Sequence, residues 1–330
     1  MIKRIQSFLS ASIFLAVLFS VSAVSLSAQT AASTTRITTA SGVRVRTAPQ
    51  TTADEVVRLP IGTVFTELER SDKKDNIGGV ETYWYRLKTA EGKEGWIFGG
   101  LTALVNAGGL EVSYINIALV RLKMETPTYS DMMDLTEFLA RVSPQITNQN
   151  RKAEIDLYHL QAMQKMLTAI PAASSDQPAY AKWTKAHEGE VVYSEPCGCW
   201  LVRNDLYWDL YKKSAKLPSA EEIAWAGANG SLPGECEGFL ECDMALFNVT
   251  FGKYLRLFPQ GKYVDEAFDH LRETLKWALE NMKDPKGIEP GDRPALQKEI
   301  VALHVTVSKT GSAKKLMILD ELDQIAGHYK

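Results

Sequence analysis

Four cysteines are the side chains in this sequence best suited to covalent or metal chemistry: Cys197, Cys199, Cys236 and Cys242. If the protein is exported, an even number of cysteines favours disulfides. We expect two bridges that join the loop of Cys197 and Cys199 to Cys236 and Cys242, because a bridge within Cys197-Gly198-Cys199 would close a very short ring. A zinc site is the alternative, although zinc-binding pairs usually have about two to four intervening residues.

Acidic side chains surround the second cysteine pair and form the only other chemical cluster of note. They are Glu235, Glu237, Glu241 and Asp243. Two carboxylates can hydrolyse a glycosidic bond when they flank it, but we interpret this group as a solvated loop beside a disulfide. The five histidines form no H-x-x-x-H pair, and the sequence has no G-x-S-x-G segment and no phosphate-binding glycine loop. We therefore expect no catalytic residue, no metal and no cofactor.

Composition and charge narrow the classes of partner. The chain has 330 residues, of which 45% are apolar and 23% charged, and this is ordinary for a globular protein of two domains. The formal net charge is −3. Because no strong basic field exists to attract phosphates, a nucleic-acid partner is not expected.

The first 28 residues have the pattern of a secretory signal peptide. Lys3 and Arg4 precede an apolar stretch over residues 8–24, and small residues lead to a cleavage site after Ala28. An uncleaved anchor is the competing interpretation. A flexible leader follows over residues 29–35, and no later stretch is long and apolar enough to span a membrane. We expect a periplasmic or secreted protein.

The elements that would position a binding surface lie over residues 36–105. Valines and arginines alternate at Val43, Arg44, Val45 and Arg46, as the two-residue period of a strand requires. Further short alternating runs are separated by glycine and proline, and we interpret residues 71–82 as a charged loop. Five or six short strands in so few residues predict a small all-β barrel.

This segment resembles the bacterial SH3 domain. That family shows a V-R turn with a nearby proline, an L-P-x-G hairpin, a W-Y pair and a closing G-x-x-G-W-[VI] hairpin. The corresponding residues here are 43–49, 59–62, 84–85 and 92–97. Two features depart from the family: Arg44 stands where asparagine is common, and the loop at residues 71–82 is longer than usual.

The resemblance implies a non-catalytic binding module for peptidoglycan or a protein segment. Aromatic rings suit a shallow groove because they give a large contact area at low entropic cost, and arginines can pair with a ligand carboxylate. Tyr85 and Ile97 are expected in the barrel core. The candidate ligand-binding residues are Tyr83, Trp84, Trp96, Phe98, Arg44 and Arg46.

A linker over residues 106–111 separates the barrel from a mainly α-helical domain over residues 112–330. Apolar residues there recur at three and four positions, whereas residues 189–200 and 232–241 are expected to be cysteine-bearing loops. Residues 251–267 resemble the helical hairpins of envelope tetratricopeptide-like proteins, within the region 245–282. The expected helices cover residues 131–142, 151–170, 178–187, 204–216, 219–228, 243–258, 263–282, 293–304 and 313–329; residues 112–124 fit either a helix or a strand.

These features predict an exported, non-catalytic scaffold protein of the bacterial cell envelope. Its SH3-like domain would bind peptidoglycan or an envelope protein segment, and its helical domain would bind a protein partner. The alternative is a cell-wall hydrolase with an unrecognised helical catalytic domain.

Overall fold

The structure is a computed structural model, and it describes residues 34–171, 174, 176–282 and 288–330. The signal peptide and most of the leader predicted from the sequence lie outside the described residues. Within the described part of the chain, no helix has the length and apolar character needed to cross a bilayer.

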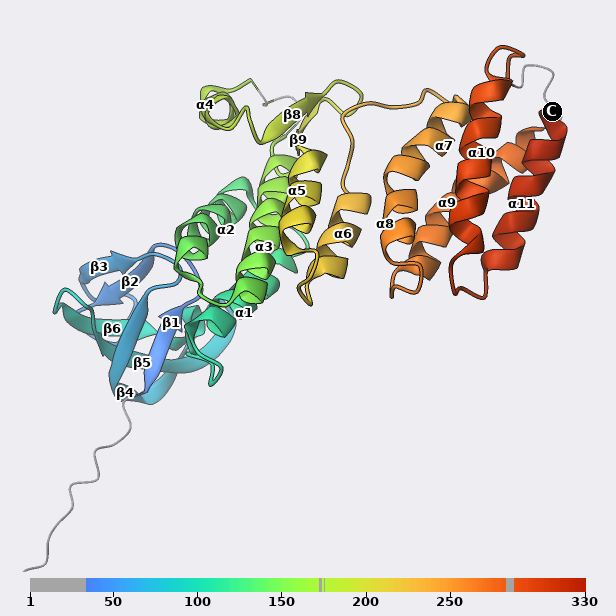
Figure 1. Cartoon of the computed structure of the whole chain (residues 1–330). Helices are drawn as coiled ribbons and strands as arrows, with labels where there is room; N and C mark the ends of the chain where they lie inside the picture. The colour runs from blue at the N-terminus through green and yellow to red at the C-terminus, as the bar shows by residue number, and fades with distance from the viewer. Residues whose placement is uncertain (1–33, 172–173, 175, 283–287) are drawn as a thin grey trace, which may run out of the picture. The chain divides into compact units, whose positions relative to one another are not determined.

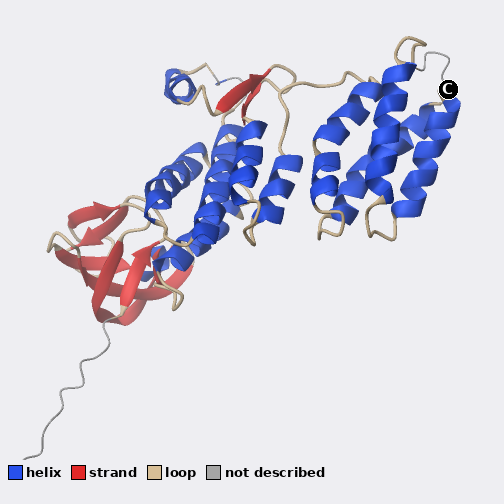
Figure 2. Ribbon diagram, in the orientation of Figure 1, coloured by secondary structure: helices blue, strands red, loops and turns tan. Residues whose placement is uncertain are grey.

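The N-terminal part is a curled antiparallel β-sheet, drawn at the blue end of the chain in Figure 1 and in red in Figure 2. Its strands follow the order β3-β2-β6-β5-β4-β1-β7, and all described pairs are antiparallel. The predicted small β-barrel is therefore confirmed. The strands are β1 (Thr35–Thr38), β2 (Val43–Arg46), β3 (Glu55–Leu59), β4 (Val64–Ile77), β5 (Val80–Lys88), β6 (Glu94–Phe98) and β7 (Thr102–Leu104).

The barrel core follows from the alternation of the strands. Val43 and Val45 of β2 are buried, whereas Arg44 between them is exposed. Tyr85 and Ile97 belong to the same apolar cluster, at 8% and 0% exposure. Their predicted core positions are confirmed.

The predicted loop at residues 71–82 is wrong, because this segment extends the hairpin of β4 and β5. Ile77 pairs with Val80, and Gly78 and Gly79 form the two-residue turn between them. Both glycines have positive φ, at 61° and 84°, which is the requirement of the tight turns that match strand twist. The register shifts between Arg70 and Lys74, so the outer half of the hairpin bends relative to the inner half.

The rest of the described chain is mainly helical, which confirms the predicted fold class. Residues 112–124, which the sequence left open between helix and strand, belong to a helix. The helices are α1 (Leu110–Leu122), α2 (Tyr129–Val142), α3 (Gln149–Thr168), α4 (Pro178–Ala186), α5 (Asn204–Ser214), α6 (Ala220–Ala228), α7 (Leu240–Val249), α8 (Phe251–Leu257), α9 (Val264–Asn281), α10 (Arg293–Ser308) and α11 (Lys315–His328), with 3-10 turns η1 (Gly99–Leu101) and η2 (Ser143–Gln145).

Two helical expectations need correction. The single helix expected over residues 243–258 is two helices, α7 and α8, because Thr250 between them has non-helical dihedrals of −103° and −98°. The loop expected over residues 189–200 contains a hairpin of β8 (Val191–Ser194) and β9 (Cys199–Val202). A four-residue strand is too short for the period of its apolar residues to separate it from a loop.

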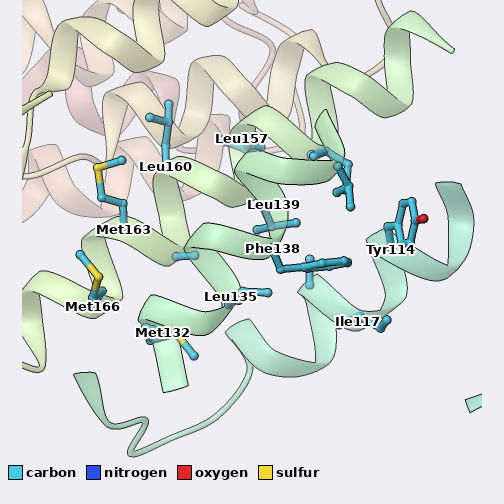
Figure 3. Close-up of a cluster of buried hydrophobic side chains, with 14 of the residues drawn as sticks. Tyr114, Ile117, Met132, Leu135, Phe138, Leu139, Leu157, Leu160, Met163 and Met166 are labelled. Atoms are coloured by element: carbon cyan, nitrogen blue, oxygen red, sulfur yellow. The ribbon is translucent and has the colours of Figure 1, made fainter. Parts of the chain in front are cut away.

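Two apolar clusters hold the helices together. In the first, Leu135, Phe138 and Leu139 of α2 pack with side chains of α1 and α3, as Figure 3 shows. Ile37 of β1 and Ile61 of the turn between β3 and β4 belong to this same cluster, so the barrel packs on the helices. The second cluster lies among α6 to α11 and includes Trp208 of α5. The division of the chain into domains at residues 106–111 remains a prediction.

The helix-turn-helix expected from the tetratricopeptide-like segment is present between α8 and α9. Pro259 and Gly261 lie in the turn between Leu257 and Val264. A Cβ on Gly261 would lie 2.4 Å from the hydroxyl of Tyr254, so the turn needs glycine for close approach. A tetratricopeptide-like repeat itself remains a prediction.

The disulfide pairing expected from the sequence is wrong, although all four cysteines are disulfide-bonded. The bridges are Cys197–Cys199 and Cys236–Cys242, with Cα atoms 5.2 Å and 5.5 Å apart. The short ring is possible because Gly198 has a φ of +59° in the turn that joins β8 to β9. Because the sulfurs are bonded to each other in pairs, they do not form the zinc site considered as the alternative.

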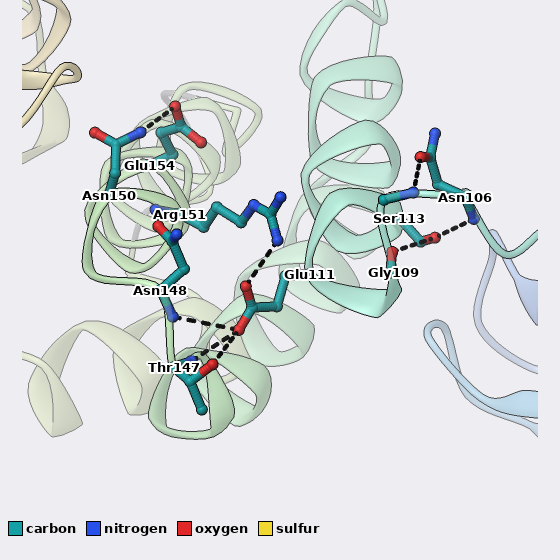
Figure 4. Close-up of polar contacts among 10 residues, drawn as sticks. Asn106, Gly109, Glu111, Ser113, Thr147, Asn148, Asn150, Arg151 and Glu154 are labelled. Carbon is teal, nitrogen blue, oxygen red and sulfur yellow. Dashed lines mark hydrogen bonds and ion pairs between the residues drawn. The ribbon is translucent and has the colours of Figure 1, made fainter.

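Glu111, in the first turn of α1, connects that helix to the start of α3. Its carboxylate accepts hydrogen bonds from the backbone amide and the hydroxyl of Thr147, at 2.8 Å and 3.0 Å, as drawn in Figure 4. Arg151 donates to its other oxygen at 3.1 Å. The Thr147 amide is the main cause that holds the pKa of Glu111 below its usual value, and the Arg151 guanidinium adds to it.

We expect Glu111→Gln to lower the free energy of unfolding at neutral pH by about 1 kcal/mol, because glutamine keeps an acceptor oxygen but loses the charge. A carboxyl group with a lowered pKa in the folded state stabilises the fold above its unfolded pKa, and this contribution is lost as pH falls through the folded pKa. Urea unfolding at pH 7 and at acid pH measures the difference. Glu137→Gln, on the exposed side of α2, is the control. A Glu111 effect that does not shrink in acid would contradict this assignment.

Candidate functional site

A row of polar and aromatic side chains crosses the outer face of the sheet. Arg46 of β2 pairs with Trp96 of β6, and Trp96 pairs on its other side with Arg86 of β5. Residues directly opposite in antiparallel strands lie on the same face of the sheet. The row continues to Glu55 of β3 beyond Arg46 and to Glu69 of β4 beyond Arg86. Trp96 is therefore a half-buried ring between two arginines.

Most cations on this face already have a carboxylate partner. Arg86 lies 2.9 Å from Glu94 and 3.4 Å from Glu69. Arg58 and Arg44 both pair with Glu55, at 2.8 Å and 3.4 Å. The hydrogen bond from Arg58 is the first cause of the lowered pKa of Glu55, and the positive charges of Arg44 and Arg46 contribute to it.

Arg46 differs from its neighbours on the sheet. One nitrogen of its guanidinium donates to the backbone carbonyl of Ala53 at 2.6 Å, which holds the side chain in place. No carboxylate of the described residues lies within ion-pair distance of it. Guanidinium groups bind carboxylates in pairs of parallel hydrogen bonds, so Arg46 has donors left for an external carboxylate beside the Trp96 ring.

Trp84 and Phe98, expected to bind ligand, are buried instead at 3% and 6% exposure. Their rings meet edge to face at 5.6 Å. The indole nitrogen of Trp84 donates to Asp75 at 3.2 Å, and its backbone amide donates to Ser71 at 3.0 Å. Both partners come from the extended β4–β5 hairpin. Residues 71–82, which are longer here than is usual in the family, therefore cover Trp84.

Tyr83 lies on the opposite side of β5 from Trp84, because neighbouring residues of a strand alternate. Its half-buried ring is covered by the guanidinium of Arg70 at 4.3 Å from the centroid. Of the six expected binding residues, Trp96, Arg46 and Arg44 are therefore accessible on the outer face, whereas Trp84 and Phe98 lie on the same face but are buried, and Tyr83 lies on the opposite face. Sequence reasoning missed Arg86 and Glu55, since only the strand register shows that they flank this row.

In the acidic cluster beside the second disulfide, Glu237 and Glu241 line a pocket of about 260 Å³ together with Trp277 of α9. Asp243 is half-buried in the first turn of α7, and burial, followed by the charge of Glu241, raises its pKa. In the part of the chain that the structure describes, no group of three or more His, Cys, Asp or Glu side chains is arranged to hold a metal ion.

Comparison with known families identifies the barrel. Residues 41–103 match the model of the bacterial SH3 domain. This part of the chain is a bacterial SH3 domain, which confirms the resemblance drawn from the sequence motifs, and such a domain points to a binding role related to the cell wall or peptidoglycan. The domain and the two disulfides are compatible with a location outside the cytoplasm. Comparisons with curated proteins and with solved structures found no match.

Proposed function

We propose that this is an exported, non-catalytic binding protein of the bacterial cell envelope, and that its SH3 domain binds a ligand carboxylate at Arg46 and Trp96. The observation that carries the proposal is the geometry of Arg46, which is held beside a half-buried ring and has no carboxylate within ion-pair distance among the described residues, since Glu55 opposite it pairs with Arg44 and Arg58. Peptidoglycan stem peptides and protein segments both present carboxylates and apolar groups, so either ligand fits this chemistry.

The helical region is proposed to bind a protein partner. Exposed apolar side chains on α10 and α11 support this idea, with Val301 at 60% and Leu316 at 75% exposure. Apolar side chains gathered on exposed helix surfaces are typical of protein interaction sites.

Sedimentation with purified cell-wall sacculi tests the SH3 proposal. We expect Trp96→Ala and Arg46→Met each to weaken binding about tenfold, because each removes a central contact of the site. Arg58→Met is the matched control: it removes the same charge from the same sheet, at an arginine already paired with Glu55. Circular dichroism melting of each variant separates lost binding from lost folding.

Three outcomes of this experiment would contradict the proposal. Equal loss with Arg58→Met would mean that net charge alone attracts the wall. Binding unaffected by either site variant would place the contact elsewhere. Clearing of the sacculus suspension that disappears on substitution of Glu235 or Glu241 would favour a hydrolase.

A further inference from the structure

A cleft of about 370 Å³, lined mainly by apolar atoms with several polar groups among them, lies in the helical region, away from the SH3 sheet face. Its walls come from α3, α5 and α6, which lie side by side in Figure 1, with β9 and the end of α1. A volume of about 370 Å³ is in the size range of small-ligand sites.

The hydroxyl of Tyr207 is a polar group in a buried position that packing alone does not explain. Its side chain is 5% exposed and lines the cleft. Its hydroxyl makes no hydrogen bond with any residue that the structure describes. The oxygen is nevertheless not fully enclosed by protein atoms, so it is open to the cleft that the side chain lines. A buried hydroxyl without a partner is costly unless water or a ligand satisfies it.

Among the described residues that line the cleft, the charge is positive and comes from Lys165. Lys165, in the last turn of α3, donates to the carbonyl of Met124 at 3.2 Å and has no carboxylate within ion-pair distance among the described residues. None of the described residues that line the cleft is acidic. The ammonium group offsets the partial negative charge of the helix end, and two of its three hydrogens remain for an anionic group.

The remaining polar groups can both donate and accept hydrogen bonds. Gln161, Asn229 and Ser231 line the cleft, and their side chains have no hydrogen-bond partner among the described residues. Gln164 accepts from the amide of Val202 at 2.9 Å, which ties β9 to α3. Amide and hydroxyl groups that donate and accept match the hydroxyls of a sugar, each of which does the same.

We propose that this cleft binds a small polyhydroxylated carboxylate, an acidic sugar, with the carboxylate at Lys165 and a ring hydroxyl at Tyr207. The apolar floor of Leu122 and Val202 faces the carbon skeleton of the ring. This site is separate from the SH3 face and does not depend on the function proposed for it.

Isothermal titration calorimetry of the purified protein with two matched pairs of sugars tests this assignment. The pairs are glucuronate with glucose, and N-acetylmuramate with N-acetylglucosamine. We expect the acid of at least one pair to bind about tenfold more tightly than its neutral partner, because a charge-assisted hydrogen bond is added. Binding of both acids identifies a general acidic-sugar site, whereas binding of N-acetylmuramate alone adds a requirement for the acetamido group.

Two variants separate the roles of the side chains. Lys165→Met should abolish the preference for the acid, and Lys213→Met, an exposed lysine of α5, should leave it unchanged. Tyr207→Phe should weaken both members of a pair about equally while leaving thermal stability unchanged, because its hydroxyl has no protein partner. Arg46→Met on the SH3 face should have no effect.

The proposal is overturned if none of the four sugars binds at millimolar concentration. It is also overturned if acid and neutral sugars bind equally, or if the preference survives Lys165→Met. If the SH3 variants no longer sediment with sacculi but still bind the sugars, the two sites act independently.

Discussion

Gly62→Ala is expected to lower the free energy of unfolding by about 2–4 kcal/mol. Gly62 follows β3 with a φ of +81°, which costs a residue with a Cβ about 1 kcal/mol. An added Cβ would also lie 2.1 Å from the ring of Phe138, which is fully buried in α2. Overpacking of this kind costs about 1–3 kcal/mol. The effect is large because the turn between β3 and β4 packs directly on the helical core.

Urea unfolding measures this prediction, and Gly42→Ala is the matched control. Gly42 also has a positive φ, at 64°, but no atom lies within 4 Å of the position of its Cβ. It should therefore show the backbone cost alone, about 1 kcal/mol. A Phe138→Leu substitution in the Gly62→Ala background should cost less than the sum of the two single changes. Equal losses for the two glycines would show that the sheet does not press on Phe138.

Glu221→Ala is expected to cost about 2–3 kcal/mol, since it breaks the hydrogen bonds that join α6 to the turn between α8 and α9. One oxygen of Glu221 accepts from the hydroxyl of Tyr254 at 2.7 Å and from the amide of Lys262 at 2.6 Å. The same tyrosine oxygen accepts from the amide of Tyr263 at 3.0 Å. The Tyr254 side chain is fully buried, so the lost partner is not readily replaced by water.

A double-mutant cycle of Glu221→Ala and Tyr254→Phe measures the coupling. Because both changes break the same bond, the double variant should lose clearly less than the sum of the single variants. Glu266→Ala, at an exposed carboxylate of α9, is the control and should fall within about 0.5 kcal/mol of the unchanged protein. Additive losses would mean that the two side chains act independently.

The sequence determined the class of each element because the relevant signals are local. Alternation in Val43-Arg44-Val45-Arg46 predicted a strand with arginines outward, and the motif set identified the SH3 domain. The apolar spacing of residues 151–170 predicted α3 to within two residues at each end. The cysteines were recognised as disulfide-bonded from their number and context.

Only the tertiary structure decided which side chains meet. A sequence does not show the strand register that places Trp96 between Arg46 and Arg86, nor the hairpin that covers Trp84. The pairing of Cys197 with Cys199 depended on a turn at Gly198, and the cleft at Tyr207 and Lys165 depended on helices distant in the chain. The physical reason is that periodicity reports the exposure of a single element, whereas a site forms where several elements pack together.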